Sequence, residues 1–229
     1  AAYAHEQICG YLKRMQSCDR SGSDEVAALL NQYAGIATAV ELIDDGGSPR
    51  RDTLMPVYLQ GSAIYVGMLR HEASDGKTSA TTTVEFTRKF HVWDVLQKQY
   101  LGCVDRANID LDMYPKFFAL LPAKPVEIAL TPAPQKVLQG ETIRIAGAIG
   151  FAAGSADEIA ALVQVVHVRV YTPEGDELEC FRDNIIFAGA AFEVVLPISY
   201  TEAAGIYTLK TEYPVTGMES QVSFEVLQN

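Results

Sequence analysis

Residues 165–181, VVHVRVYTPEGDELECF, contain two runs of alternating apolar residues separated by a turn built from Pro173, Glu174 and Gly175. Because successive side chains of a strand point to opposite faces, the first run has an apolar face and a polar face. The apolar face would hold Val166, Val168 and Val170, and the polar face His167, Arg169 and Tyr171. The stretch therefore predicts a β-hairpin with one buried side.

The same pattern recurs on both sides of this hairpin. From residue 125 to the end we expect about seven strands: VEIALTP, ETIRIAGAIGF, QVVHVRVYT, DELECFRDNII, AFEVVLPIS, GIYTLKTEYP and SQVSFEVLQ. The intervening stretch GSADEIAAL, residues 154–162, is expected to be a loop or a single helical turn. This number of short alternating strands is typical of an immunoglobulin-like sandwich.

The preceding part of the chain also has strand periodicity. Residues 36–122 contain the runs IATAVELID, LMPVYLQ, AIYVGMLRHE, TSATTTVEF, KFHVWDVLQ, QYLGCVD and KFFALLP. Short turns separate them, and helical crossovers are lacking, so an antiparallel sheet is expected. A stretch with Pro122, Pro125, Pro132 and Pro134 follows, and it favours a joint near residue 124.

Two helical patterns open the chain. HEQICGYLKRM has Ile8, Tyr11, Leu12 and Met15 on one helical face, and SGSDEVAALLNQYAG has Ser23 as a candidate N-cap. We therefore expect a mostly β chain with one or two N-terminal α-helices and two antiparallel β-sandwich domains. The predicted parts are a helix and linker over 1–22, a first β-domain with a short leading helix over 23–124, and the immunoglobulin-like sandwich over 125–229.

Composition narrows the function classes. The formal net charge is −11, with 18 Lys plus Arg against 29 Asp plus Glu, which disfavours nucleic acid and anionic membranes as partners. No apolar run approaches the about 20 residues that a membrane span requires. The four cysteines lack metal-site spacing, so we expect free thiols packed as small apolar residues, with a Cys9–Cys18 bridge as the less favoured alternative.

Catalytic signatures are absent from the sequence, and we expect neither a catalytic residue nor a metal or cofactor. Asp44 with Asp45 fits a turn, and Asp110 with Asp112 fits the solvent face of a strand, more easily than either fits a glycosidase pair. The histidines at 5, 71, 91 and 167 lie in no recognisable motif.

One aromatic cluster is a candidate binding site. Trp93, the only tryptophan, lies near Tyr100 across a predicted hairpin, with Asp94 beside it. Such side chains can hold a sugar ring by stacking and hydrogen bonding. The alternative, which the apolar neighbours of Trp93 favour, is that its ring belongs to the core.

GSAIYVGMLR at 61–70, KFHVWDVLQKQYLG at 89–102 and DLDMYPKFFALLP at 110–122 resemble the C-terminal accessory region of large bacterial β-galactosidase-like glycoside hydrolases. HVRVYTPEGDEL and FEVVLPISYTEAAGIYTLKTEYPVTG extend the resemblance to the sandwich that follows in that group. Trp93 replaces the tyrosine usual there, and no matching position is catalytic.

The resemblance implies an exported bacterial module whose parent carries its catalytic domain upstream of these residues. Such a module would pack against that catalytic domain, mediate homo-oligomerisation or contact glycan. The alternative is an extracellular adhesin-type module that binds a glycan or a protein directly, and a small hydrolase is the third hypothesis.

Overall fold

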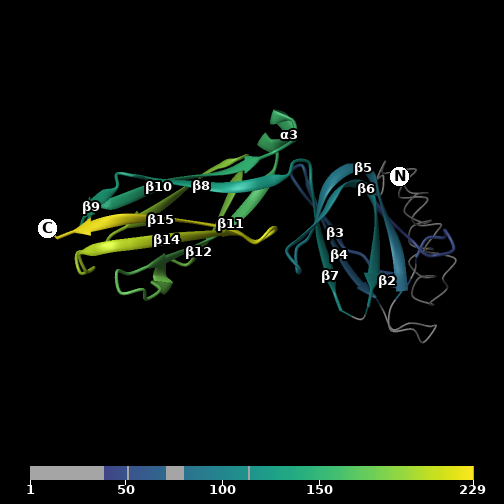
Figure 1. The fold of residues 1–229 in the computed structure, drawn as a ribbon, viewed down its shortest axis with the longest axis horizontal. Coiled ribbons are helices and arrows are strands. Elements are labelled where there is room, and N and C mark those ends of the chain that lie inside the picture. Colours follow the sequence, from purple (N-terminus) through teal and green to yellow (C-terminus); the bar gives the residue numbers. More distant parts are fainter. Residues whose placement is uncertain (1–38, 51, 71–79, 113, 229) are drawn as a thin grey trace, which may run out of the picture. The chain divides into compact units, whose positions relative to one another are not determined.

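The computed structural model of the chain describes residues 39–50, 52–70, 80–112 and 114–228. By their contacts, the described residues from Val40 onward form one compact unit. They are mostly strand, and the named strand pairs are antiparallel except for one (Figure 1). Both predicted N-terminal helices lie outside the described residues.

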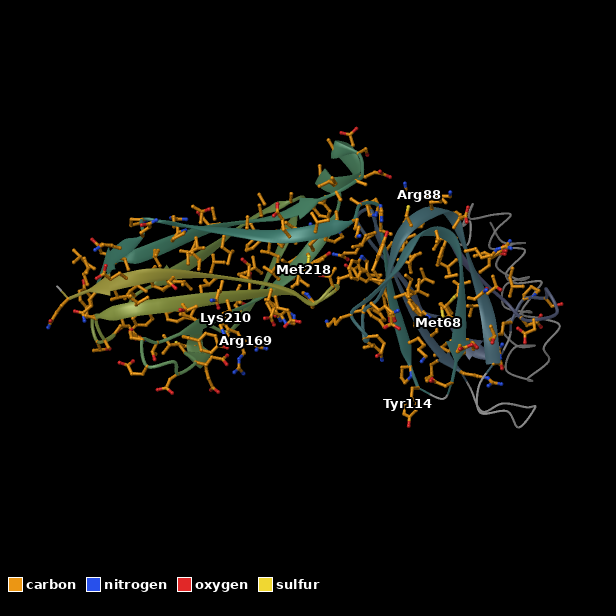
Figure 2. The ribbon with its side chains drawn as sticks, in the orientation of Figure 1. Met68, Arg88, Tyr114, Arg169, Lys210 and Met218 are labelled. Carbon is orange, nitrogen blue, oxygen red and sulfur yellow. The ribbon has the colours of Figure 1, made fainter. Side chains whose placement is uncertain are left out.

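The first set of strands forms a seven-stranded sheet in the order β1-β5-β7-β4-β2, with β3 pairing β4 and β6 pairing β5. In β4 the alternating residues Ile64, Val66 and Met68 are buried, as the period of two requires. Figure 2 shows Met68 among these strands and Tyr114 projecting from them. The strands are β1 (Val40–Ile43), β2 (Thr53–Leu54), β3 (Val57–Gln60), β4 (Ala63–Arg70), β5 (Ala80–Asp94), β6 (Gln99–Leu111) and β7 (Lys116–Leu121).

The prediction of separate strands in TSATTTVEF and KFHVWDVLQ is wrong, because their residues 80–86 and 89–94 belong to one strand, β5. Pairing of β5 with β6 shifts register between Glu85 and Phe90 and then resumes. The irregular stretch between them, residues 86–89, contains neither glycine nor proline, so the chain bulges without turning back. As a result, the first half of β5 pairs with β1 and the second half with β7.

The second set of strands forms two sheets, one of three strands in the order β13-β10-β8 and one of five in the order β12-β11-β14-β15-β9. Alternating residues of both sheets are buried in one cluster, including Ile143, Ile145, Val168 and Leu209. The strands are β8 (Pro125–Ala133), β9 (Lys136–Leu138), β10 (Thr142–Phe151), β11 (Val163–Tyr171), β12 (Asp183–Ala188), β13 (Ala191–Pro197), β14 (Gly205–Tyr213) and β15 (Met218–Leu227).

This region is an immunoglobulin-like sandwich by its internal contacts. The hydroxyl of Tyr207, at the start of β14, donates to the Ala203 carbonyl at 2.9 Å, and a Glu202 carboxylate oxygen lies 3.2 Å away. A tyrosine that bonds back to the backbone a few residues upstream is the tyrosine corner of such sandwiches. Burial, with the nearby Glu202 carboxylate, raises the pKa of Tyr207 to about 12.

The hairpin of residues 165–181 is confirmed in its first arm and wrong in its second. The three valines of β11 are buried, and the polar face is more exposed. After the turn, however, Glu177 forms only an isolated bridge with Tyr171, and a short 3-10 helix, η1 (Glu179–Phe181), intervenes. The Glu177 carboxylate accepts from Arg182 Nε at 2.8 Å across this helix, and continuous pairing with β11 begins only at β12.

Two smaller predictions have different outcomes. The expected helical turn in residues 154–162 is present as α3 (Ala156–Ala160), capped by the Ser155 hydroxyl, which accepts from the Glu158 amide. The predicted joint near residue 124 falls between β7 and β8. Among the described strands, those before this joint pair within the seven-stranded sheet, and those after it pair within the sandwich. An isolated bridge between Gly61 and Leu162 connects the two sides of the joint. The division into two domains stays a prediction.

Candidate ligand-binding surfaces

The hairpin between β5 and β6 brings Trp93, Asp94 and Tyr100 together. Trp93 lies opposite Tyr100 in the strand register, and their ring centroids are 5.0 Å apart with the planes inclined by 45°. Trp93 is 9% exposed and belongs to the buried cluster. Its indole is therefore a core side chain, as the apolar-core alternative predicts, and the two rings do not form a flat open platform.

Asp94 stabilises the turn of the same hairpin. One of its carboxylate oxygens accepts from the amides of Leu96 and Gln97, at 3.0 Å in each case. These bonds hold the turn in which Lys98 adopts a φ of 55°. Asp94 is itself buried, so a ligand would have to compete with the turn for this carboxylate.

Tyr100 is half-buried and forms the accessible edge of this cluster. Its hydroxyl lies 2.7 Å from Nδ1 of His91, and the Lys124 ammonium lies 4.4 Å from its ring centroid. Burial, reinforced by Lys124, lowers the pKa of His91. Burial also raises the pKa of Tyr100. A ligand could reach this polar edge but could not stack on Trp93 behind it. Binding at Trp93, Asp94 and Tyr100 stays a prediction.

Asp44, Asp110 and Asp112, three of the four residues in the acidic pairs that the sequence offered, are engaged in local structure. An Asp44 carboxylate oxygen accepts from the amides of Gly46 and Ser48, at 2.9 Å in each case, in the expected turn. Asp110 accepts from the Thr81 hydroxyl, and Asp112 pairs with Lys116 at 3.0 Å. The hydrogen bond from Lys116 is the main reason that the pKa of Asp112 is lowered.

The cysteines differ from the expectation. Cys103 and Cys180 are free thiols, but both are exposed, so the prediction that they pack as apolar residues is wrong. Cys103 is on β6 and Cys180 in η1, which has no buried residue. Cys9, Cys18, His5 and His71 lie outside the described residues. Within the described ranges, no group of three His, Cys, Asp or Glu side chains could hold a metal ion.

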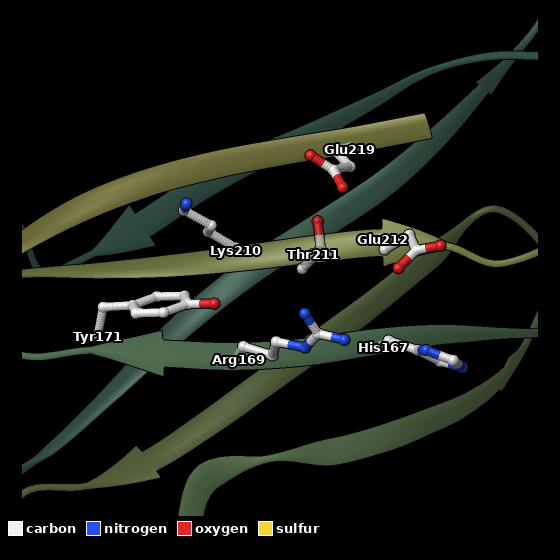
Figure 3. A pocket seen from close by; sticks show the side chains of 7 residues that line it. All are labelled: His167, Arg169, Tyr171, Lys210, Thr211, Glu212 and Glu219. Atoms are coloured by element: carbon white, nitrogen blue, oxygen red, sulfur yellow. The ribbon is translucent and has the colours of Figure 1, made fainter. Parts of the chain in front are cut away.

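The outer face of the five-stranded sheet carries a groove that the sequence revealed only in part. Its lining comes from three strands: His167, Arg169 and Tyr171 of β11, Lys210, Thr211 and Glu212 of β14, and Glu219 of β15 (Figure 3). Alternation predicted the polar face of β11. The partners on β14 and β15 could not be predicted, because the register between distant strands is not visible in one sequence.

Charged side chains form two rows in this groove, and each row runs across the strands. Arg169 lies opposite Lys210, and the Lys210 ammonium lies 4.9 Å from the Tyr171 ring centroid. Two residues along these strands, His167 lies opposite Glu212, and Glu212 lies opposite Glu219. Figure 2 places Arg169 and Lys210 close together on this face. The groove therefore has a cationic row beside an aromatic ring and an acidic row next to it.

The groove is shallow. Its volume is about 120 Å³, whereas enclosed small-molecule sites have roughly 300–1,000 Å³. Like charges directly opposite each other on a sheet are also unfavourable, so the Arg169–Lys210 pair does not stabilise the fold. The arrangement suits surface contact with a polar ligand better than enclosure of a substrate.

No protein-family model and no curated protein matches the chain. Similar solved structures include a chimeric titin Z1Z2 tandem functionalized with a fibronectin peptide, at 17% identity over 83% of each chain and a TM-score of 0.26. The amphioxus IgVJ-C2 molecule has 13% identity over 83% of this chain and 90% of that one, with a TM-score of 0.23. A β-glycosidase from Bacteroides vulgatus has 16% identity over 80% of this chain and 27% of that one, with a TM-score of 0.31.

These likenesses assign no family, and the immunoglobulin-like character of the sandwich is seen in its two packed sheets and in the tyrosine corner at Tyr207. None of the helices among the described residues has the length and hydropathy that a membrane span requires.

Proposed function

We propose that the chain is a non-catalytic β-sandwich module of a larger, exported, carbohydrate-active bacterial protein whose catalytic domain lies upstream. The observation that carries the non-catalytic part of the proposal is that three candidate carboxylates are engaged in turns. Asp44, Asp94 and Asp112 each accept hydrogen bonds from turn amides. Carboxylates held in this way stabilise turns and are not free to activate water or donate a proton.

Glu212 and Glu219 are the acidic pair that the groove itself offers for hydrolysis. They lie opposite each other on β14 and β15, and both line the groove. Opposite positions have Cβ atoms about 5 Å apart, near enough for two carboxylates to act on one bond. They share an open face, however, and the shallow groove does not enclose a substrate.

Hydrolysis of aryl glycosides by the full chain tests this proposal. We expect no turnover above buffer, and Glu212→Gln and Glu219→Gln should leave that result unchanged. Turnover that either substitution abolishes would contradict the non-catalytic role and identify this pair as a catalytic site.

The second candidate is direct recognition of a glycan or a protein, and the groove is the observation that favours it. Sugar hydroxyls or an acidic group could bond to Arg169 and Lys210 beside Tyr171. A glycan array with the full chain tests this candidate, with Arg169→Ala as the variant and Arg144→Ala as the control. Arg144 is an exposed arginine of β10 paired with Glu193 at 2.6 Å, so it matches Arg169 in type but not in place.

The array also separates the groove from the Trp93 cluster. Trp93 is the only tryptophan, so its fluorescence reports on its own surroundings. Binding that Arg169→Ala abolishes, with Trp93 emission unchanged, would place the ligand on the groove. Binding that shifts the Trp93 emission and survives Arg169→Ala would support the predicted site at Trp93, Asp94 and Tyr100.

A further inference from the structure

Strand β3 is an edge strand whose side chains are exposed on both faces. All four residues, Val57–Gln60, are exposed, with Leu59 reaching 70% and Tyr58 59%. Val57 and Leu59 lie opposite the buried residues Val66 and Ile64, so they share the core-facing side of the sheet. Apolar side chains on that side are ordinarily covered, and here the core does not extend over them.

Charge is missing from this edge as well. From Thr53 to Leu69, which includes β2, β3 and nearly all of β4, the chain contains no charged residue, although 21% of all residues are charged. Leu54 on β2 and Leu69 on β4 add further exposed apolar surface. Natural sheets usually block such an edge with lysine, proline or a bulge, because unpaired backbone groups recruit another strand.

The direction of the backbone groups of β3 follows from one hydrogen bond. The Gly67 amide donates to the Pro56 carbonyl at 2.9 Å, and these residues are opposite each other in the register that pairs Val57 with Val66. In an antiparallel ladder, bonded pairs alternate with non-bonded pairs. Tyr58 and Gln60 therefore direct their backbone groups toward β4, while Val57 and Leu59 direct theirs toward the open side.

We propose that β3 pairs with β3 of a second copy of this chain, antiparallel, about a two-fold axis at Tyr58. In this register Val57 lies opposite Leu59 of the partner subunit, and the reverse pair follows by symmetry. The residues with outward backbone groups then face each other, so both pairs form the two hydrogen bonds of a bonded pair. A register shifted by one residue would oppose outward groups to inward ones.

The side chains fit the same axis. Tyr58 lies opposite Tyr65, which stacks on Phe117 with ring centroids 6.1 Å apart and planes 12° from parallel. Pairing at Tyr58 extends this aromatic row across the interface, and aromatic cross-strand pairs stabilise sheets. On the other face, Val57 and Leu59 of each copy cover one another. An uncharged, apolar, self-complementary edge fits a second copy better than a charged partner.

A cysteine at the axis tests the geometry directly. In the proposed register Tyr58 faces itself in a non-bonded pair, where Cα atoms are about 4.5 Å apart, within the range of a disulfide. Tyr58→Cys should therefore form an intermolecular disulfide under mild oxidation. Gln60→Cys, two residues from the axis, should not. Mass spectrometry of peptides separates this bond from those of the native cysteines.

The oligomeric state tests the surface independently. Sedimentation of the full chain over rising concentration should show a dimer, which Leu59→Lys abolishes because it places a charge on each side of the axis. The control is Ile186→Lys on the edge strand β12, where Ile186 is 72% exposed. A monomer at every concentration with no disulfide at position 58, or a dimer lost in Ile186→Lys and kept in Leu59→Lys, would overturn the proposal.

Discussion

The edge strands of the sandwich and the β3 edge of the seven-stranded sheet differ in charge. On the sandwich, Lys136 of β9 pairs with Glu225 at 2.7 Å, Glu193 of β13 pairs with Arg144, and β12 begins with Asp183. The β3 edge has no charge and its apolar residues are exposed. Charged edges resist addition of a strand and uncharged ones permit it, so the contrast indicates where this chain associates.

The largest expected effect is the difference in the loss of stability between truncating a core leucine and truncating an edge leucine. Leu209 of β14 is fully buried, so Leu209→Ala should lower the free energy of unfolding by about 2–5 kcal/mol. Leu59→Ala should change it by no more than about 0.5 kcal/mol at concentrations where the chain is a monomer. Chemical denaturation measures both, and similar losses would show that β3 belongs to a core.

A smaller effect is expected at the tyrosine corner, a stabilising contact of the sandwich. Tyr207→Phe removes the hydroxyl that bonds to Ala203 and leaves the ring packed against Phe224, with centroids 5.7 Å apart. The loss should be about 1–2 kcal/mol. Tyr200→Phe is the control, because Tyr200 is 74% exposed and should show almost no change. An unchanged stability in Tyr207→Phe would mean that the corner does not stabilise the sandwich.

The charged edge of the sandwich should contribute little to stability but more to solubility. Lys136→Ala removes the exposed pair with Glu225 and should cost about 0–1 kcal/mol. If the charge protects β9, the variant should self-associate more than the unsubstituted chain, by light scattering at equal concentration. Equal scattering would show that the charge does not protect this edge.

The smallest effect concerns pH and His91. Its pKa is lowered in the folded chain by burial and by Lys124, so the unfolded chain takes up a proton first as the pH falls below about 6.5. The free energy of unfolding should therefore decrease through that window and level off below the folded pKa. His91→Gln should flatten this slope relative to the unsubstituted chain, and an unchanged slope would assign it to other groups.

The sequence predicted the strand content and the inner and outer faces of β11, because a period of two determines which residues share a face. The apolar neighbours of Trp93 also favoured a core position for its ring. Prediction from the sequence failed where pairing between distant residues decides the structure. The bulge that joins the two halves of β5 and the rows of the groove both depend on register.

The open β3 edge illustrates the same limit. The absence of charge from Thr53 to Leu69 is visible in the sequence, and it fits a buried strand equally well. Only the pairing shows that β3 has β4 on one side and nothing described on the other.

Hydrogen exchange of the Val57 and Leu59 amides at several protein concentrations tests the proposed contrast between edges most directly. We predict that protection of both amides rises with concentration, while that of Ile186 on β12 stays constant. Exchange at Val57 and Leu59 that is independent of concentration, or a concentration dependence confined to Ile186, would contradict the assignment of β3 as the associating edge.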